Sequence, residues 1–402
     1  MKSWTFISQK YYWGVIELYR IGQEEIEAIA RVINGKKLFR VGAPYQEVDK
    51  FEREWAQHLG VEYTLCVNGG TTALIAGLAG MGIGPGDEVI IPSYTFMATA
   101  IAVLAVGAIP VLAEIDETMT IDPEDLKRKL TPETKAVIPV HMCGFPANMD
   151  AIMELSKKHG FKVLEDACQA DGGSFRGKHL GTWGHAGAFS FNDFKIITAG
   201  EGGALVTNDY NLYERALIYH DGGAAFRPFA GELKTPVFTG SQFRANEIMG
   251  AILRVQLRRL PGILEDLRAV KREFVAHFRE RMIPSNDLEG DCGTTVGFSF
   301  ATEEEARSFA TSPGVEGWLP IDSDKHVFIN WDPILQKRGA HHEALNPYRF
   351  PENQGLRMDY SKDMCPRTLE ILRRTVYINL NPDWTEEELK MRIDSCQQAL
   401  NS

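Results

Sequence analysis

Lys195 and Asp166 are the two residues of this chain whose types and settings best suit covalent chemistry. Lys195 follows the apolar run 187–191 and precedes the glycine-rich stretch 200–203, and Asp166 closes the apolar run that begins at 163. A primary amine forms a Schiff base with an aldehyde, and a carboxylate can hold a pyridine nitrogen protonated. The two side chains therefore suit the two ends of one aldehyde-bearing pyridine ring.

Pyridoxal 5′-phosphate (PLP) carries an aldehyde on a pyridine ring, so the pair predicts a PLP site. Most lysines are solvated surface charges, but Lys195 has the apolar neighbours Phe194 and Ile196. Asp166 could equally cap a turn. Glu165 competes with it, yet strand alternation directs neighbouring side chains to opposite faces of a sheet.

Other residues follow predicted strands at positions that suit the rest of this cofactor. Gly70 and Thr71 open a helix after a strand, where glycine and free amides favour a phosphate; a plain tight turn is the alternative. Phe96 could stack on a flat ring, although phenylalanine usually belongs to the core. Gln169 could contact the ring, and Ser190 could donate a hydrogen bond to the phosphate.

Strand and helix patterns alternate from position 63 to position 164, which predicts a largely parallel sheet covered by helices on both faces. The expected strands are 63–67, 88–91, 109–112, 136–140 and 162–164, followed by 187–191 and 203–206. The expected helices are 22–33, 45–59, 71–79, 96–106, 123–130 and 149–159.

The C-terminal part is more mixed. A long amphipathic segment, 247–278, connects to strand candidates at 295–300, 326–329 and 376–378, and a final helix over 386–400 has Thr385 as its N-cap. We expect an N-terminal arm at 1–20, a large cofactor-binding domain at 21–255 and a small domain at 256–402.

Composition excludes several classes of protein. The net charge of −11 over 402 residues gives no basic surface for nucleic acid. The six cysteines are scattered and form no C-x-x-C pair, which favours reduced thiols over a disulfide framework or a metal site. No apolar stretch reaches the roughly 20 residues of a membrane span, and no signal peptide is apparent. We expect a cytoplasmic protein without membrane or nucleic-acid partners.

Together these segments resemble the DegT-type sugar aminotransferases, a PLP-dependent family of the aspartate-aminotransferase fold. The resemblance runs from Gly42 to the Cys365-Pro366 segment. It implies an α/β fold of type I, with a mostly parallel seven-stranded sheet and a smaller C-terminal α+β domain. The matching motifs are Gly70-Thr71 with Ala73-Leu74, Pro92-Ser93 with Thr95-Phe96, Val140-His141 with Gly144, Glu165-Asp166-Ala167 with Gln169, Phe189-Ser190-Phe191 with Lys195, and the run 200–203.

The resemblance also implies roles for single residues. Lys195 would form the Schiff base and later shuttle a proton, and Asp166 would pair with the pyridine nitrogen. Phe96 would stack on the ring and Gln169 would contact it; the phosphate would be bound by Gly70, Thr71 and Ser190. Members with histidine at the Lys195 position are dehydratases, so lysine implies transamination. Glutamate would convert PLP to pyridoxamine 5′-phosphate, which then aminates a sugar.

Three positions depart from the family pattern. Family members are homodimers with shared active sites, in which an asparagine reaches the phosphate of the partner subunit; this chain has Gln242 there. Its amide keeps the donor on a side chain one methylene longer. His185 stands where an aspartate is common and receives no role, and Asp171 stands where many members have histidine.

The acceptor is less well defined by the sequence. The tracts 326–331 and 339–347 are rich in polar and aromatic residues, which suit a carbohydrate, although an ordinary surface loop would look similar. They resemble the tracts of members acting on substrates without a nucleotide. The preferred acceptor is 8-oxo-3-deoxy-manno-octulosonate, giving 8-amino-3,8-dideoxy-manno-octulosonate for lipopolysaccharide synthesis. Nucleotide-linked ketosugars and inososes remain alternatives. So do a non-catalytic regulator and a lyase or cysteine desulfurase using Cys168.

Overall fold

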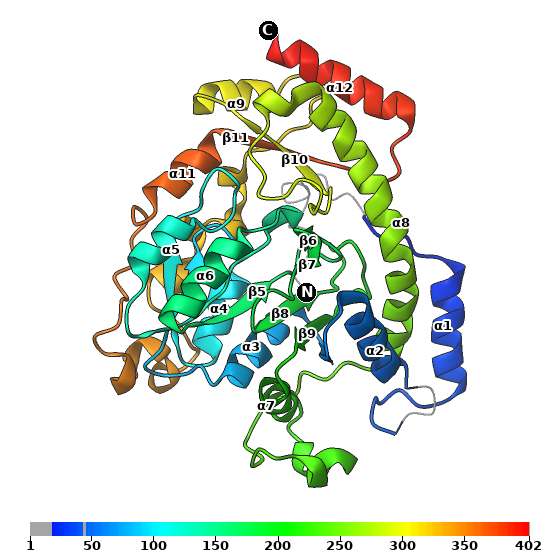
Figure 1. Ribbon diagram of the computed structural model, residues 1–402, viewed down its shortest axis with the longest axis vertical. Helices are drawn as coiled ribbons and strands as arrows, with labels where there is room; N and C mark the ends of the chain where they lie inside the picture. The colour runs from blue at the N-terminus through cyan, green and yellow to red at the C-terminus, as the bar shows by residue number, and fades with distance from the viewer. Residues whose placement is uncertain (1–17, 43–45, 402) are drawn as a thin grey trace, which may run out of the picture.

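A seven-stranded sheet in the order β1-β9-β8-β5-β4-β2-β3 forms the centre of the computed structural model, which describes residues 18–42 and 46–401 (Figure 1). All neighbouring strands from β8 to β3 run parallel, while β9 is antiparallel to both β8 and β1. The expected α/β fold with a mostly parallel seven-stranded sheet is confirmed. The strands are β1 (Tyr63–Val67), β2 (Glu88–Pro92), β3 (Ile109–Ala113), β4 (Thr134–Val137), β5 (Lys162–Asp166), β8 (Ala186–Ser190) and β9 (Gly203–Thr207).

Helices cover both faces of the sheet, so its strands are apolar on both sides. Strand alternation divides the core in two: Val163 packs with the side of α2, α6 and α8, and Leu164 with the side of α3, α4 and α7. The helices are α1 (Gln23–Asn34), α2 (Glu47–Leu59), α3 (Gly70–Met81), α4 (Ala98–Ala105), α5 (Pro123–Lys129), α6 (Met149–His159), α7 (Tyr210–His220) and α8 (Glu247–Phe278).

A second, two-stranded sheet follows the long helix α8 in the chain. Figure 1 shows α8 along one side of the molecule, with this sheet beside the C-terminal half of the helix. Its strands β10 (Thr295–Ser299) and β11 (Thr375–Asn379) are antiparallel. Thr385 caps the last helix as expected, since its hydroxyl accepts the Glu388 amide while the Glu388 carboxylate accepts the Thr385 amide. The predicted boundary at 255/256 falls inside α8, and the domain division stays a prediction. The C-terminal helices are α9 (Glu303–Ala310), α10 (Asp332–Leu335), α11 (Pro366–Arg373) and α12 (Glu386–Leu400).

The strand expected at 326–329 is wrong. Two short 3-10 turns, Asp324–His326 and Phe328–Asn330, occupy this segment instead. Val327 makes only a single bridge, with Tyr94, because the segment lies along the short connection that follows β2. The apolar residues of 326–329 are therefore buried by one loop against another.

Some elements have no counterpart in the sequence prediction. Helix α7 begins after Asp209, whose carboxylate accepts the amides of Asn211 and Leu212. The hairpin of β6 (Ser174–Phe175) and β7 (Lys178–His179) has strands of two residues each, which are too short to show an alternating apolar pattern in the sequence. Boundaries also differ by a few residues: the helix expected at 96–106 is α4, and the strand expected at 136–140 is β4.

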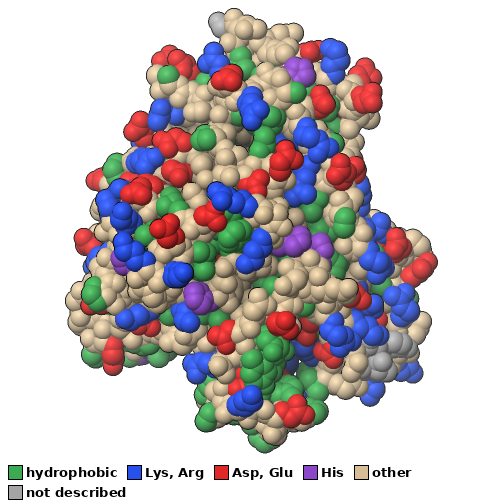
Figure 2. Space-filling view, viewed as in Figure 1, with side chains coloured by type: hydrophobic (Ala, Val, Ile, Leu, Met, Phe, Trp, Pro, Cys, Tyr) green, Lys and Arg blue, Asp and Glu red, His purple; other side chains and the backbone are tan. Residues whose placement is uncertain are grey.

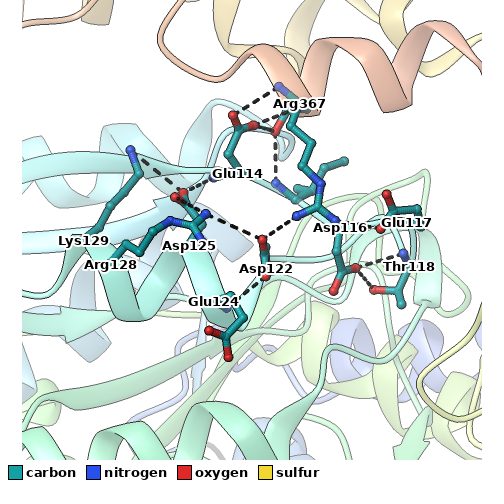
Figure 3. A network of polar contacts seen from close by, with 12 residues as sticks. Glu114, Asp116, Glu117, Thr118, Asp122, Glu124, Asp125, Arg128, Lys129 and Arg367 are labelled. Atoms are coloured by element: carbon teal, nitrogen blue, oxygen red, sulfur yellow. Dashed lines mark hydrogen bonds and ion pairs between the residues drawn. The ribbon is translucent and has the colours of Figure 1, made fainter.

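A polar network joins α11 to the edge of the large sheet (Figure 3). Arg367 makes ion pairs with Asp122 at 2.7 Å and Glu117 at 2.8 Å. The neighbouring Thr368 donates to Glu114 and also bonds the hydroxyl of Ser93, directly after β2. The C-terminal segment is thus held against the strand end that carries Phe96.

Acidic and basic side chains are interspersed on the face of the molecule that Figure 2 shows, and no large patch of one charge occurs on that face. All six cysteines lie within the described ranges and are free thiols. No group of histidine, cysteine and carboxylate side chains suited to a metal ion occurs in the described part of the chain. No helix in that part is long and apolar enough to cross a membrane.

Candidate active site

A cavity of about 430 Å³ lies at the carboxyl ends of β2, β5 and β8. Open α/β sheets bind ligands at this edge, because side chains that follow parallel strands meet there. Seven of the predicted residues line the cavity: Gly70, Thr71, Phe96, Asp166, Gln169, Ser190 and Lys195. Residues up to 125 positions apart in the chain, from Gly70 to Lys195, are thereby brought to one site.

Asp166 is the last residue of β5, with 6% of its surface exposed. One carboxylate oxygen accepts the hydroxyl of Thr99 on α4 at 2.8 Å, and the other accepts the amide of Cys168 at 3.2 Å. Thr95, just before Phe96, bonds the same Thr99 hydroxyl at 2.9 Å. These contacts fix the orientation of the carboxylate toward the cavity.

Glu165 points to the other face of the sheet, as strand alternation predicts. Its carboxylate accepts the amides of Gly181 and Gly184 at 2.8 and 2.7 Å and pairs with the His141 ring at 3.0 Å. All of its contacts lie away from the cavity. Glu165 therefore supports the fold and does not compete with Asp166.

The first turn of α3 presents free amides to the cavity. No described residue accepts a hydrogen bond from the amides of Gly70, Thr71 or Thr72, and the N-cap Gly69 has no side chain to do so. The hydroxyl of Thr72 folds back onto Gly69 and is not part of the lining. Helix N-termini of this kind bind anions such as phosphate.

Gly70 is required by the close approach of two other elements. A Cβ at this position would lie 2.7 Å from the Cβ of Ser190 and 2.8 Å from the Sγ of Cys168. Ser190 ends β8, and its Oγ would lie 3.2 Å from a Cβ at Gly70, so the hydroxyl lies beside the first turn of α3. Backbone and hydroxyl donors thus share one end of the cavity.

The aromatic side of the cavity is formed by Phe96, which is 42% exposed and therefore accessible to a ligand. The His326 ring lies 5.8 Å from it, centroid to centroid. Gln169 also lines the cavity, and its side-chain oxygen accepts the amide of Cys143 at 3.1 Å. Its orientation is therefore fixed by the backbone that follows β4.

Lys195 lies in the turn between β8 and β9, where its amide bonds the carbonyl of Asn192 at 3.1 Å. Its ammonium makes no ion pair within the described ranges, although Asp166 and Glu201 also line the cavity. A flat ring between Phe96 and Lys195 would therefore meet an unengaged amine.

Asp171 is fully buried, and neither carboxylate oxygen has a hydrogen-bond partner among the described residues. Burial raises its pKa well above the ordinary range, and the nearby Lys195 charge opposes this only in part. Burial therefore favours the protonated form of this carboxyl group in the folded protein. Asp171 lies near Lys195 but does not line the cavity.

The cavity thiols are unsuited to nucleophilic chemistry. Burial raises the pKa of Cys168 well above its usual range, and that of Cys143 to about 12. Thiolates are the reactive form of cysteine, so burial disfavours the reactive form of both side chains. This argues against a role for Cys168 as a desulfurase nucleophile.

The sequence did not predict which residues of the C-terminal segment line the cavity. The C-terminal segment contributes Lys325, His326, Thr294, Thr295 and Asn379, while none of residues 339–347 lines the cavity. The tract at 326 was noted for its polar and aromatic composition, but Lys325 just before it was not. The segment around Lys325 pairs with the loop after β2, and such contacts between loops leave no periodic pattern of apolar residues in the sequence.

Gln242 does not line the cavity. Its side chain is exposed, and its amide oxygen accepts the backbone amide of Arg244 at 2.7 Å. His185 also has a local role, since its ring accepts the Val163 amide at 3.0 Å. Within one chain, neither Gln242 nor His185 contacts the cavity, although both depart from the family pattern.

The residues fit PLP at three separate points. The unpaired amides of α3 and the hydroxyl of Ser190 suit its phosphate, and the oriented carboxylate of Asp166 suits its ring nitrogen. Lys195 offers an amine with no ion-pair partner in the described part of the chain, as the aldehyde requires. The Cβ-free surface at Gly70 leaves room for the close approach of an anion.

Residues 19–297 match the DegT/DnrJ/EryC1/StrS aminotransferase family. The chain is 39% identical to 3-amino-5-hydroxybenzoate synthase of Amycolatopsis mediterranei, over 59% of this chain and 60% of that protein. It is 41% identical to GDP-perosamine synthase of Caulobacter vibrioides, over 58% and 61%. The matched segment thus spans about three fifths of these relatives. A crystal structure of 3-amino-5-hydroxybenzoic acid synthase superposes with a TM-score of 0.76 at 29% identity, covering 95% of this chain and 97% of that one.

We predict that Asp171→Asn makes the protein more stable, and more so at high pH. In the unfolded chain Asp171 ionises above about pH 4, whereas burial raises the pKa of the folded carboxyl. The wild type therefore loses stability as pH rises from the unfolded pKa toward the folded pKa. Asparagine has the same shape without this loss. Its melting temperature should exceed that of the wild type by at least ~2 °C more at pH 8 than at pH 5.

Differential scanning fluorimetry at both pH values measures this difference. Asp359→Asn, at an exposed position, is the matched control and should change neither melting temperature. An equal shift for Asp171→Asn at both pH values would mean that the folded carboxyl is already ionised.

Proposed function

The chain belongs to the DegT/DnrJ/EryC1/StrS aminotransferase family, and we propose that it is a PLP-dependent aminotransferase that moves an amino group from glutamate to a keto- or aldehydo-sugar. The observation that carries the proposal is the meeting of Lys195, Asp166, Phe96 and the amides of α3 around one cavity. Each suits a different part of the same cofactor. A purely structural cavity has no need of all four.

When bound, PLP supplies an aldehyde that can hold an amino group and a protonated ring that accepts electrons from the carbon being deprotonated. Asp166 would keep the ring nitrogen protonated, since Thr99 and the Cys168 amide hold its carboxylate in place. Lys195 Nζ would carry the proton to and from the substrate Cα. Phe96 would pack on the ring and Gln169 would contact it, while the amides of Gly70 and Thr71 and the Ser190 hydroxyl would hold the phosphate.

We propose 8-oxo-3-deoxy-manno-octulosonate as the acceptor, with 8-amino-3,8-dideoxy-manno-octulosonate as a product used in lipopolysaccharide synthesis. The support is the placement of His326 in the cavity wall, from the tract that resembles members acting on free sugars. Thr294, Thr295 and Asn379 add polar groups that suit hydroxyls. A nucleotide-linked ketosugar or an inosose is the alternative, and the similarity to GDP-perosamine synthase supports the first of these.

A side-by-side turnover assay with glutamate and each acceptor tests the activity and the substrate together. Wild type should aminate the octulosonate faster than a nucleotide-linked ketosugar or an inosose. Lys195→Ala should lower turnover by at least ~10³-fold, because the proton shuttle is lost, while the circular dichroism spectrum stays unchanged. If turnover occurs only with another acceptor, the octulosonate is not the substrate and that acceptor takes its place in the proposal. Undiminished turnover by the lysine variant would remove Lys195 from the mechanism, and no transfer to any acceptor would favour a non-catalytic regulator.

We also propose a homodimer with shared active sites. Gln242 is exposed and does not line the cavity of its own chain. It could therefore bind a phosphate only in the cavity of a second subunit. Exposed apolar residues support a covered surface: Phe226 is 90% exposed and Phe39 is 46% exposed. Light scattering should give twice the mass of the 44.9 kDa chain. A mass of one chain at micromolar concentration would contradict this assembly.

A further inference from the structure

Lys325 places a second ammonium group at the cavity wall. Its Nζ lies 5.8 Å from the centroid of the Phe96 ring and 5.6 Å from that of Phe194. No carboxylate of the described residues lies within ion-pair distance of it. The ammonium is therefore held near two aromatic rings at the opening where a substrate would enter, with its charge uncompensated.

The backbone around Lys325 is fixed more firmly than that of an ordinary surface loop. The Lys325 carbonyl accepts the amide of Met97 at 3.2 Å and the indole nitrogen of Trp331 at 3.1 Å. The next carbonyl, of His326, accepts the amide of Thr95 at 3.0 Å. Lys325 is thus anchored directly to the segment that carries Phe96, and its position follows that of the ring.

Among the cationic side chains that line the cavity, Lys325 is the one available to bind a substrate. Only two lysines and no arginine line the cavity within the described ranges, and Lys195 would be engaged by the cofactor in the proposed function. His326 is neutral, since burial and the charges of Lys325 and Lys195 lower its pKa to about 3. Its Nδ1 pairs with the Ser323 hydroxyl, which orients the ring beside Phe96. An anionic substrate group therefore finds one free positive charge in this wall.

Resting on the proposed function, we propose that Lys325 is a specificity residue that binds a carboxylate of the substrate. Both half-reactions take place in one cavity, so one ammonium can serve the carboxylate of the amino donor, that of a sugar-acid acceptor, or both in turn. A charge-assisted hydrogen bond is about twice as strong as a neutral one. Acceptors or donors without a carboxylate would gain nothing from this contact.

The test is calorimetric titration of the cofactor-loaded protein with glutarate, which has two carboxylates but neither an amino nor a keto group to react. Lys325→Met should weaken glutarate binding about ten- to a hundredfold, because methionine keeps the packing on the rings without the charge. Lys325→Arg should stay within about threefold of wild type, since it keeps a cation able to bind a carboxylate.

Lys178→Met is the matched control. Lys178 is an exposed lysine whose Nζ lies 4.9 Å from the Trp183 ring, outside the cavity. This variant should bind glutarate like wild type. Equal affinity of Lys325→Met and wild type, or no glutarate binding by wild type at millimolar concentration, would overturn the proposal. The arginine variant serves as the decisive comparison if the methionine variant folds poorly.

Rapid-mixing measurements of the two half-reactions then identify the source of the carboxylate. Weaker apparent binding of glutamate alone assigns Lys325 to the donor, weaker binding of the octulosonate alone assigns it to the acceptor, and loss of both assigns it to both. Failure of the proposed function would appear differently, as wild type that transfers no amino group to any acceptor. Unchanged binding in a variant that still transfers amino groups would refute the role of Lys325 alone.

Discussion

The parallel pairing of β5 with β8 is the constraint on which the rest of the site depends. Its register places Asp166 opposite Ala188, so Asp166 and Ser190 end neighbouring strands at the same edge of the sheet. The chain then turns into the loop of Lys195, and β9 returns antiparallel beside β8. A slip of one residue in this pairing would turn Asp166 to the face occupied by Glu165.

The segment 165–171 shows how burial assigns different tasks to carboxylates of similar chemistry. Glu165 accepts two backbone amides, pairs with the His141 ring and joins β5 to the 181–184 turn. Asp166 has two donors and an open side toward the cavity. Asp171 has none among the described residues, and burial raises its pKa. Chain position alone does not distinguish these environments, because each depends on segments distant in sequence.

The sequence predicted the elements whose patterns are local and long. The limits of β1, α6 and α8 agree with the expected ranges, and seven of the eight proposed site residues line one cavity. Prediction was poorer where contacts between loops decide the structure. The segment at 326–329 has the composition of a strand, but its neighbours are the backbone groups of Ser93 and Thr95 rather than another strand. Lys325 could not be found from the sequence for the same reason.

The most direct test of the account is the visible absorbance of the purified, PLP-loaded protein before and after glutamate is added without a sugar. We predict an absorption band of lysine-bound cofactor that disappears with glutamate, because Lys195 and Asp166 together complete the first half-reaction. A band that glutamate leaves unchanged would contradict the proposed aminotransferase with glutamate as donor. No band at all would contradict the binding of the cofactor by Lys195.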